Sequence, residues 1–175
     1  MKLISLGREG FEEAYAIMEA SFPSDEYRPR AEQLALLDDP RYTLLGCRAP
    51  DGALMAFLCV WRLEDFLFLE HFAVAEAHRN GGLGGKLLTM LKEWAGCPIL
   101  LEAELPETPI ACRRLGFYRR NGFFVNPYPY CQPPISAGKN PVPLMILSSG
   151  DELSPAAFHR ARACLYREVY HQSEE

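Results

Sequence analysis

The sequence has little of several features that identify common classes of protein. No apolar run is long enough to span a membrane, because charged residues interrupt the longest candidates. The six cysteines are scattered, with no Cys-x-x-Cys pair and no Cys/His ligand spacing, so we predict free thiols and no metal site. The net charge of −5 argues against nucleic acid as a partner, because phosphate binding favours a basic surface.

The first residues also lack the long apolar region of a signal peptide, so we expect the chain to stay in the cytoplasm. A chain of 175 residues is long enough for one domain with a buried core and no disulfides. Its hydrophobic fraction of 49% and charged fraction of 23% are ordinary for a globular protein. Without repeats, low-complexity tracts or a linker, the sequence predicts a single domain over residues 1–175.

Apolar periodicity and turn residues predict a mixed α/β layout. Pro50-Asp51-Gly52 marks a hairpin turn, Thr108-Pro109 marks a helix start, and the proline-rich segment 127–143 is predicted to be irregular. The predicted strands are residues 1–6, 42–47, 53–61, 66–74, 99–104, 123–126 and 144–147, and the predicted helices begin at residues 8, 30, 83, 109 and 155.

The most informative segment joins the buried strand at 66–74 to the glycine-rich start of an apolar helix. Its residues are Arg79, Asn80, Gly81, Gly82, Leu83, Gly84, Gly85 and Lys86. Glycines there let backbone N–H groups approach an anion at the positive end of a helix dipole, so we predict a pyrophosphate site. A dinucleotide-binding turn would need a third glycine at a different step, and a Walker loop would need Ser or Thr in place of Leu87.

A second motif, Tyr118-x-x-x-Gly122-Phe123, ends the helix predicted from residue 109. In this order and separation, the two motifs resemble those of the GNAT superfamily of acyl-CoA-dependent N-acyltransferases. That family pairs an [Arg/Gln]-x-x-Gly-x-[Gly/Ala] turn with such a tyrosine segment. The resemblance implies a mixed, mostly antiparallel central sheet flanked by helices over about 1–148, with an added C-terminal helix over about 150–171.

The resemblance also implies an activity, which is transfer of the acetyl group of acetyl-CoA to a primary amine by direct attack in a ternary complex. The acceptor is a small molecule or a peptide. The family's fourth strand pairs its amides with the pantetheine arm, and the matching residues here are Phe72, Ala73 and Val74. Two alternatives stay open: a longer acyl-CoA as donor, and a CoA-binding sensor without turnover. The oligomeric state also stays open, with a homodimer among the arrangements considered.

Tyr118 resembles the family's general acid, which protonates the departing thiolate. Glu70 is the leading candidate for the base, because it interrupts an apolar strand, and strand alternation places it on one face with Phe72 and Val74. A carboxylate in apolar surroundings is expected to have a raised pKa. Alternation places His71 on the opposite face, where we expect a structural role unless a bulge re-aims it.

Other polar residues are candidates for the acceptor pocket. Glu102 and Glu104 share one face of the next strand, where either could bind a cationic acceptor or serve as the base instead. Tyr130 and Gln132 in the proline-rich segment could line the same pocket, or belong to a rigid surface loop.

Overall fold

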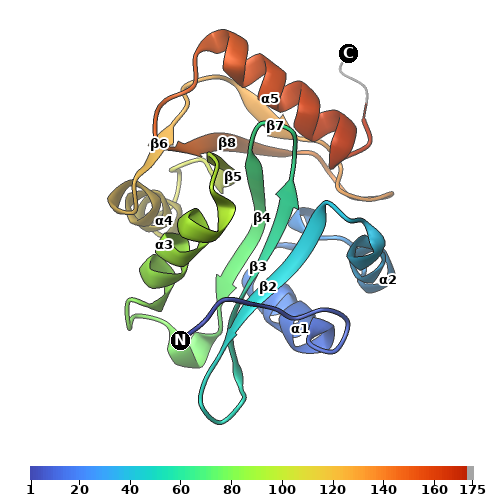
Figure 1. Ribbon diagram of the computed structural model, residues 1–175. Coiled ribbons are helices and arrows are strands. Elements are labelled where there is room, and N and C mark those ends of the chain that lie inside the picture. The colour runs from blue at the N-terminus through green and yellow to red at the C-terminus, as the bar shows by residue number, and fades with distance from the viewer. Residues whose placement is uncertain (173–175) are drawn as a thin grey trace.

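The computed structural model describes residues 1–172 and shows a single mixed sheet between helices (Figure 1). The strands are β1 (Ile4–Ser5), β2 (Tyr42–Arg48), β3 (Leu54–Arg62), β4 (Leu67–Val74), β5 (Ile99–Glu104), β6 (Phe123–Val125), β7 (Tyr130–Gln132) and β8 (Val142–Ser149). The α-helices are α1 (Phe11–Ser21), α2 (Arg30–Ala35), α3 (Leu83–Ala95), α4 (Pro109–Arg120) and α5 (Pro155–Glu168), and the short 3₁₀ turns are η1 (Ser24–Glu26), η2 (Leu36–Asp38) and η3 (Glu76–His78).

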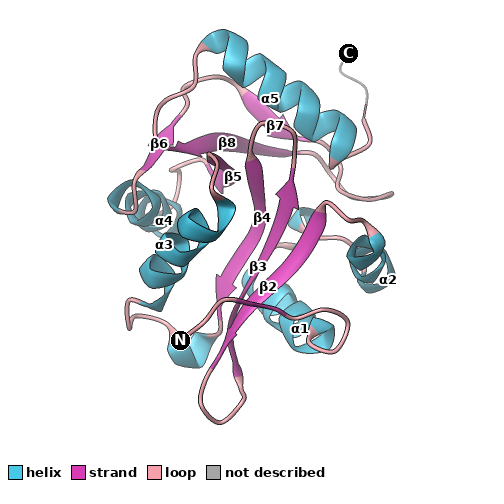
Figure 2. Cartoon of the chain, in the orientation of Figure 1, coloured by secondary structure: helices cyan, strands magenta, loops and turns pink. Residues whose placement is uncertain are grey.

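The strands lie in the order β1-β2-β3-β4-β5-β8-β6, and β7 pairs with the other end of β8 (Figure 2). In the described part of the chain, β4 and β5 form the one parallel pair, and every other pairing is antiparallel. The predicted fold class, a mostly antiparallel mixed sheet flanked by helices, is therefore confirmed.

Two apolar layers cover the two faces of the sheet. One layer packs Phe11 and Met18 of α1 and Phe158 and Leu165 of α5 against the sheet. The other packs α3 and α4, through residues such as Leu91. Figure 1 shows α3 and α4 together on one side of β4, with α1 and α2 on the other and α5 across β7 and β8. The added C-terminal helix thus contributes to the same core as α1.

Several local predictions are confirmed because the side chains behind them bind backbone groups only two or three residues away in the sequence. Thr108 Oγ1 accepts a hydrogen bond from the Ala111 amide at 3.1 Å, and Pro109 follows it in the first turn of α4. Ser154 caps α5 in the same way. Asp51 accepts from the Ala53 amide in the hairpin between β2 and β3. None of the helices within residues 1–172 is both long and apolar enough to cross a membrane.

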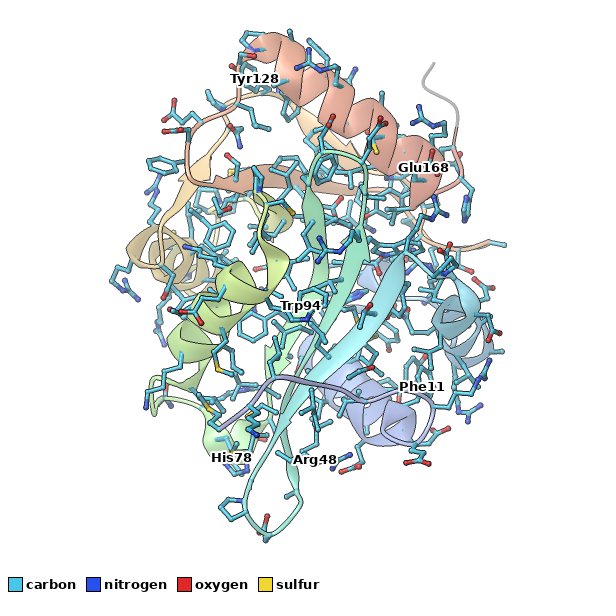
Figure 3. The ribbon with its side chains drawn as sticks, in the orientation of Figure 1. Phe11, Arg48, His78, Trp94, Tyr128 and Glu168 are labelled. Carbon is cyan, nitrogen blue, oxygen red and sulfur yellow. The ribbon has the colours of Figure 1, made fainter. Side chains whose placement is uncertain are left out.

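The structure departs from the prediction in the proline-rich segment. Residues 130–132 form β7 instead of an irregular loop, because β8 begins at Val142 and offers them a partner in register, with Tyr130 opposite Leu144. Such a pairing depends on residues far away in sequence and has no local pattern. Next to β7, Tyr128 packs on Phe158 with ring centroids 4.8 Å apart, at the start of α5 (Figure 3).

Candidate active site

The parallel strands β4 and β5 separate halfway along their length and leave a gap in the sheet. Their pairing runs from Leu67 opposite Ile99 to Leu69 opposite Leu101 and stops there. Beyond that point β5 stays paired with β8 as far as Glu104. A cavity of about 620 Å³ occupies the gap and is lined from both faces of the sheet, by α3 and α4 on one side and by the end of α1 and η1 on the other.

The predicted anion-binding turn stands at one end of this cavity. Gly82 has a φ of +73° and Asn80 a φ of +66°, which is the left-handed region that favours glycine. A Cβ atom on Gly82 would meet nothing within 4 Å, so the backbone there is open to a ligand. The turn therefore presents bare main chain at the N-terminus of a thirteen-residue helix, as an anion site requires.

Two of the other glycines serve the packing of helices instead. A Cβ on Gly84 would lie 3.1 Å from the Phe117 ring, and one on Gly85 would lie 3.0 Å from Asn121 Oδ1. These two glycines let α3 and the end of α4 approach closely. The cavity wall includes Arg79, Asn80, Gly82, Leu83, Gly84 and Gly85 from the predicted set, whereas Gly81 and Lys86 are exposed outside it.

Along β4, the open edge faces the cavity from Glu70 to Val74. The Ala75 amide donates to Met55 of β3 at 2.8 Å, so alternation turns the Ala73 amide toward β3 and the amides of Phe72 and Val74 toward the gap. Of the three predicted strand residues, Phe72 and Val74 therefore have the available donors. Arg79 Nε donates to the Val74 carbonyl at 2.9 Å and joins the glycine turn to this edge.

Tyr118 lines the cavity from α4. Its side chain is buried, and within residues 1–172 no group hydrogen-bonds to its hydroxyl. Burial raises the pKa of Tyr118 to about 12, with Arg114 lowering it and Glu104 raising it to lesser extents. The phenol therefore keeps its proton at neutral pH and is available as a donor.

The predicted orientation of Glu70 is wrong, because a β-bulge interrupts the alternation. Cys59 pairs with His71 but Val60 pairs with Leu69, so Glu70 is the extra residue of β4. The bulge turns Glu70 and His71 to the same face, with Glu70 Oε2 3.7 Å from His71 Nδ1. This is the face covered by α1, not the face of Phe72.

The expected rise in the pKa of Glu70 is also wrong. Its side chain is 1% exposed and pairs with Arg28 at 2.8 Å, and Trp61 Nε1 donates to it at 3.1 Å. Burial opposes the charged carboxylate, but Arg28 and the Trp61 hydrogen bond outweigh burial, and the pKa of Glu70 lies below its usual value. A carboxylate with a lowered pKa and these partners is a poor proton acceptor.

The acidic residues of β5 differ in their surroundings. Glu102 lines the cavity but accepts hydrogen bonds from the hydroxyls of Tyr130 and Tyr170, and burial raises its pKa to about 7. Glu104 also lines the cavity and pairs with Arg114 at 2.7 Å. Gln132 reaches the wall, whereas Tyr130 stands behind Glu102 and is not part of the wall.

Comparison with known proteins identifies the family. The model of the acetyltransferase (GNAT) family matches residues 9–123. The chain belongs to this family. The GNAT resemblance inferred from the two motifs is thus confirmed. A separate observation is that residues 1–172 hold no group of three or more His, Cys, Asp or Glu side chains that could bind a metal ion.

Relatives of this GNAT chain show how far the similarity extends. It is 31% identical over 111 residues to the "Putative acetyltransferase YjbC" of Bacillus subtilis (strain 168), an alignment that covers 62% of this chain but only 55% of that protein. A solved GNAT-family structure from Bacteroides thetaiotaomicron shares 28% identity and has a TM-score of 0.89, with 97% and 98% of the two chains covered. Neither name specifies an acceptor.

A more distant solved structure shares the fold alone. An aminoglycoside 6'-N-acetyltransferase in complex with coenzyme A has a TM-score of 0.63 at 13% identity, covering 85% of this chain and 96% of its own. The GNAT fold is therefore shared with a protein whose solved structure contains coenzyme A.

Glu26 is a cavity residue that sequence analysis of this GNAT chain missed. It ends η1, is half-buried, and lines the cavity. Burial raises its pKa to about 7, with Glu104 adding to the rise and Arg114 opposing it. Its segment, Pro23-Ser24-Asp25-Glu26, has the composition of any surface loop, so no local signal distinguished it.

Proposed function

We propose that this GNAT chain transfers the acetyl group of acetyl-CoA to a primary amine by direct attack in a ternary complex. The observation that carries the proposal is the cavity through the sheet. Its lining, which comes from both faces of the sheet, includes open main-chain donors, Tyr118 of α4 and the carboxylates of Glu26, Glu102 and Glu104. A donor and a basic acceptor can therefore enter from opposite faces and meet at the edge of β4.

The residues present fit CoA. The open main chain at Asn80 and Gly82 suits a diphosphate, and Arg79, Arg113 and Arg120 give the cavity wall positive charge. The outward amides of Phe72 and Val74 suit the amide-bearing pantetheine arm and the thioester carbonyl. Fixed main-chain donors beside a developing oxyanion are an effective source of catalysis in a site that excludes water.

The chemistry divides between the two faces. The amine nitrogen forms a bond to the acetyl carbon, and the bond between that carbon and the CoA sulfur breaks. Tyr118 gives its proton to the departing sulfur and is reprotonated from solvent. No cysteine lines the cavity within the described residues, which favours direct attack over an acyl-enzyme.

Thiol release from acetyl-CoA tests the proposal. We expect release above background with at least one member of a panel that contains 1,4-diaminobutane, glucosamine, lysine amide and a peptide with a free N-terminus. Longer acyl-CoA donors in the same assay compare chain lengths. If CoA binds by calorimetry but no amine and no donor gives thiol, the chain is a CoA-binding module and the proposed transfer is wrong.

Tyr118→Phe is expected to lower kcat by about 10²-fold, the lower end of the range for general acids, because a thiol of pKa about 8.5 needs only modest assistance. The dissociation constant of CoA by calorimetry should be nearly unchanged. Tyr128→Phe is the matched control, since that hydroxyl donates to the Leu153 carbonyl away from the cavity. Wild-type turnover in Tyr118→Phe would remove Tyr118 from the mechanism.

A further inference from the structure

We propose that Glu26 is the general base that accepts a proton from the acceptor ammonium, and that His71 is the positioning residue that holds Glu26 at the cavity. The inference rests on the proposed acetyl transfer and deepens it, because it names the group that makes the amine nucleophilic. An alkylamine of pKa about 10.4 is almost entirely protonated at neutral pH and must lose a proton before it can attack.

The partners of the acidic side chains lining the cavity single out Glu26. Glu70 is paired with Arg28, Glu104 is paired with Arg114, and both oxygens of Glu102 accept from tyrosine hydroxyls. Within residues 1–172, the Glu26 carboxylate alone in this set has no hydrogen bond or ion pair. It therefore has lone pairs available for a proton.

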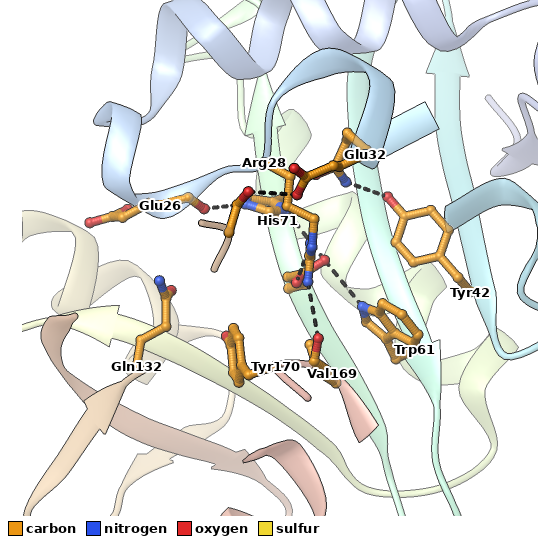
Figure 4. Close-up of polar contacts among 12 residues, drawn as sticks. Glu26, Arg28, Glu32, Tyr42, Trp61, His71, Gln132, Val169 and Tyr170 are labelled. Carbon is orange, nitrogen blue, oxygen red and sulfur yellow. Dashed lines mark hydrogen bonds and ion pairs between the residues drawn. The ribbon is translucent and has the colours of Figure 1, made fainter. Parts of the chain in front are cut away.

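The main chain of Glu26 is fixed although its side chain is free. His71 Nε2–H donates to the Glu26 carbonyl at 2.7 Å, and the His71 ring packs edge-on against Phe22. The Glu26 amide donates to Pro23 at 2.9 Å, which closes η1. Figure 4 shows the carbonyl of Glu26 directed at His71 and its carboxylate pointing away, on the side of Gln132.

The bulge in β4 produces this anchorage. The bulge turns two consecutive side chains to one face. His71 therefore hydrogen-bonds to the Glu26 carbonyl, while Glu70 forms an ion pair with Arg28, two residues later. Arg28 is fixed further by donating to the Val169 carbonyl at 3.3 Å. Two adjacent residues of β4 thus hold the segment that carries Glu26, one before and one after residue 27.

Burial sets the protonation of Glu26 first, and the charged groups that face it adjust it. Glu104 and Glu102 of β5 are like charges, Arg114 of α4 is the opposing cation, and His71 of β4 stays neutral because burial lowers its pKa. With burial, the net effect is a pKa of about 7 for Glu26. Glu26 is therefore the charged carboxylate above about pH 7, and this is the form that accepts a proton.

The protons balance with one base and one acid. The ammonium gives one proton to the Glu26 carboxylate, which later releases it to water. The amine nitrogen loses its second proton to solvent as the amide forms, and this replaces the proton that Tyr118 gives to the thiolate. The products are the N-acetylated acceptor, CoA as the thiol, and one proton.

The test compares Glu26→Gln with wild type, using acetyl-CoA and the best acceptor from the amine panel. We expect kcat/KM at pH 7 to fall by about 10²- to 10³-fold. In wild type, kcat/KM should rise with pH through a limb near pH 7. In Glu26→Gln this limb should vanish, and kcat/KM should instead keep rising with pH until the pH reaches the pKa of the amine itself. CoA affinity by calorimetry and the melting temperature should not change.

Two matched variants control the result. Glu19→Gln changes an exposed glutamate of α1 outside the cavity and should leave the profile unchanged. Glu102→Gln removes the other carboxylate whose pKa is about 7 and should keep the limb, moved slightly to lower pH because a like charge facing Glu26 is lost. If Glu26→Gln keeps the limb, or if only Glu102→Gln removes it, the assignment of Glu26 is overturned while acetyl transfer stands. If wild type releases no thiol with any amine, the proposed function fails as well.

The role of His71 is tested by His71→Phe and His71→Gln. His71→Phe keeps a ring against Phe22 but removes the donor to the Glu26 carbonyl. Glu26 should then become better solvated, and its limb should shift to lower pH as kcat falls. His71→Gln offers an amide donor and should restore the limb in part. If both variants lose stability but the limb of their pH profile stays where it is in wild type, His71 has only a structural role.

Discussion

Gly82→Val is expected to lower the affinity for CoA by at least about 10²-fold, to the limit of detection by calorimetry. Gly82 has a φ of +73° and opens α3 with bare main chain at the cavity. A left-handed conformation costs a residue with a Cβ about 1–2 kcal/mol, and a β-branched residue more. The valine methyl groups would also occupy the space that the diphosphate needs, so both effects oppose binding.

Gly96→Val is the matched control for that substitution. Gly96 caps the opposite end of the same helix with a φ of +64°, and a Cβ there meets nothing within 4 Å. The backbone strain is therefore similar, but Gly96 does not line the cavity. We expect a loss of stability with CoA affinity retained. Equal loss of affinity in both variants would mean that helix stability, not the open main chain, governs binding.

Arg28→Met is expected to lower the free energy of unfolding by about 3–5 kcal/mol, because it leaves the Glu70 carboxylate buried without its partner. The two side chains are 5% and 1% exposed, so water cannot compensate. Urea unfolding at pH 7 measures the loss. Adding Glu70→Leu to Arg28→Met should recover most of it, since an apolar residue removes the uncompensated charge.

The control is Arg48→Met, which breaks a surface pair with Glu13 of similar length, 2.7 Å. Its expected cost is at most about 1 kcal/mol, because exposed pairs are screened by water and salt. If Arg28→Met costs no more than Arg48→Met, the buried pair does not hold the η1 segment and β4 together.

The pH dependence of the same variant gives an independent check. In wild type the pKa of Glu70 is below its usual value, so its stabilising effect is present above about pH 4.3 and is lost as pH falls further. In Arg28→Met, burial without Arg28 raises the pKa of Glu70, so the variant gains stability on acidification. The difference between the two proteins should therefore be largest near neutral pH and shrink below about pH 5. A constant difference would exclude Glu70 as its source.

The sequence was most informative where the chemistry is carried by the main chain. The glycine turn, its helix and the Tyr118 segment follow from residue identity, because glycine adopts that backbone at the lowest cost and a capped, amphipathic stretch favours a helix from its own residues. The GNAT family followed from the same two motifs and is confirmed by the family match. Even here, the role of Gly84 and Gly85 in helix packing required the position of α4.

The positions of the carboxylates depended on tertiary structure. Strand alternation placed Glu70 on the face of Phe72 and Val74, but one extra residue in β4 turned it to the other face, where it forms a buried pair with Arg28, because a bulge reverses the assignments that follow from a period of two. Glu26 belongs to a segment with no periodic pattern, and the contact that fixes its carbonyl comes from His71, 45 residues away.

The sequence by itself thus determined the family, the glycine turn and most of the elements, since these depend on residues close together in the chain. Tertiary structure alone decided where β4 and β5 separate, which acidic side chain stays free, and the pairing of β7 with β8. The physical reason is that the pKa and the direction of a buried carboxylate depend on the charges and donors packed around it, and those come from distant parts of the sequence.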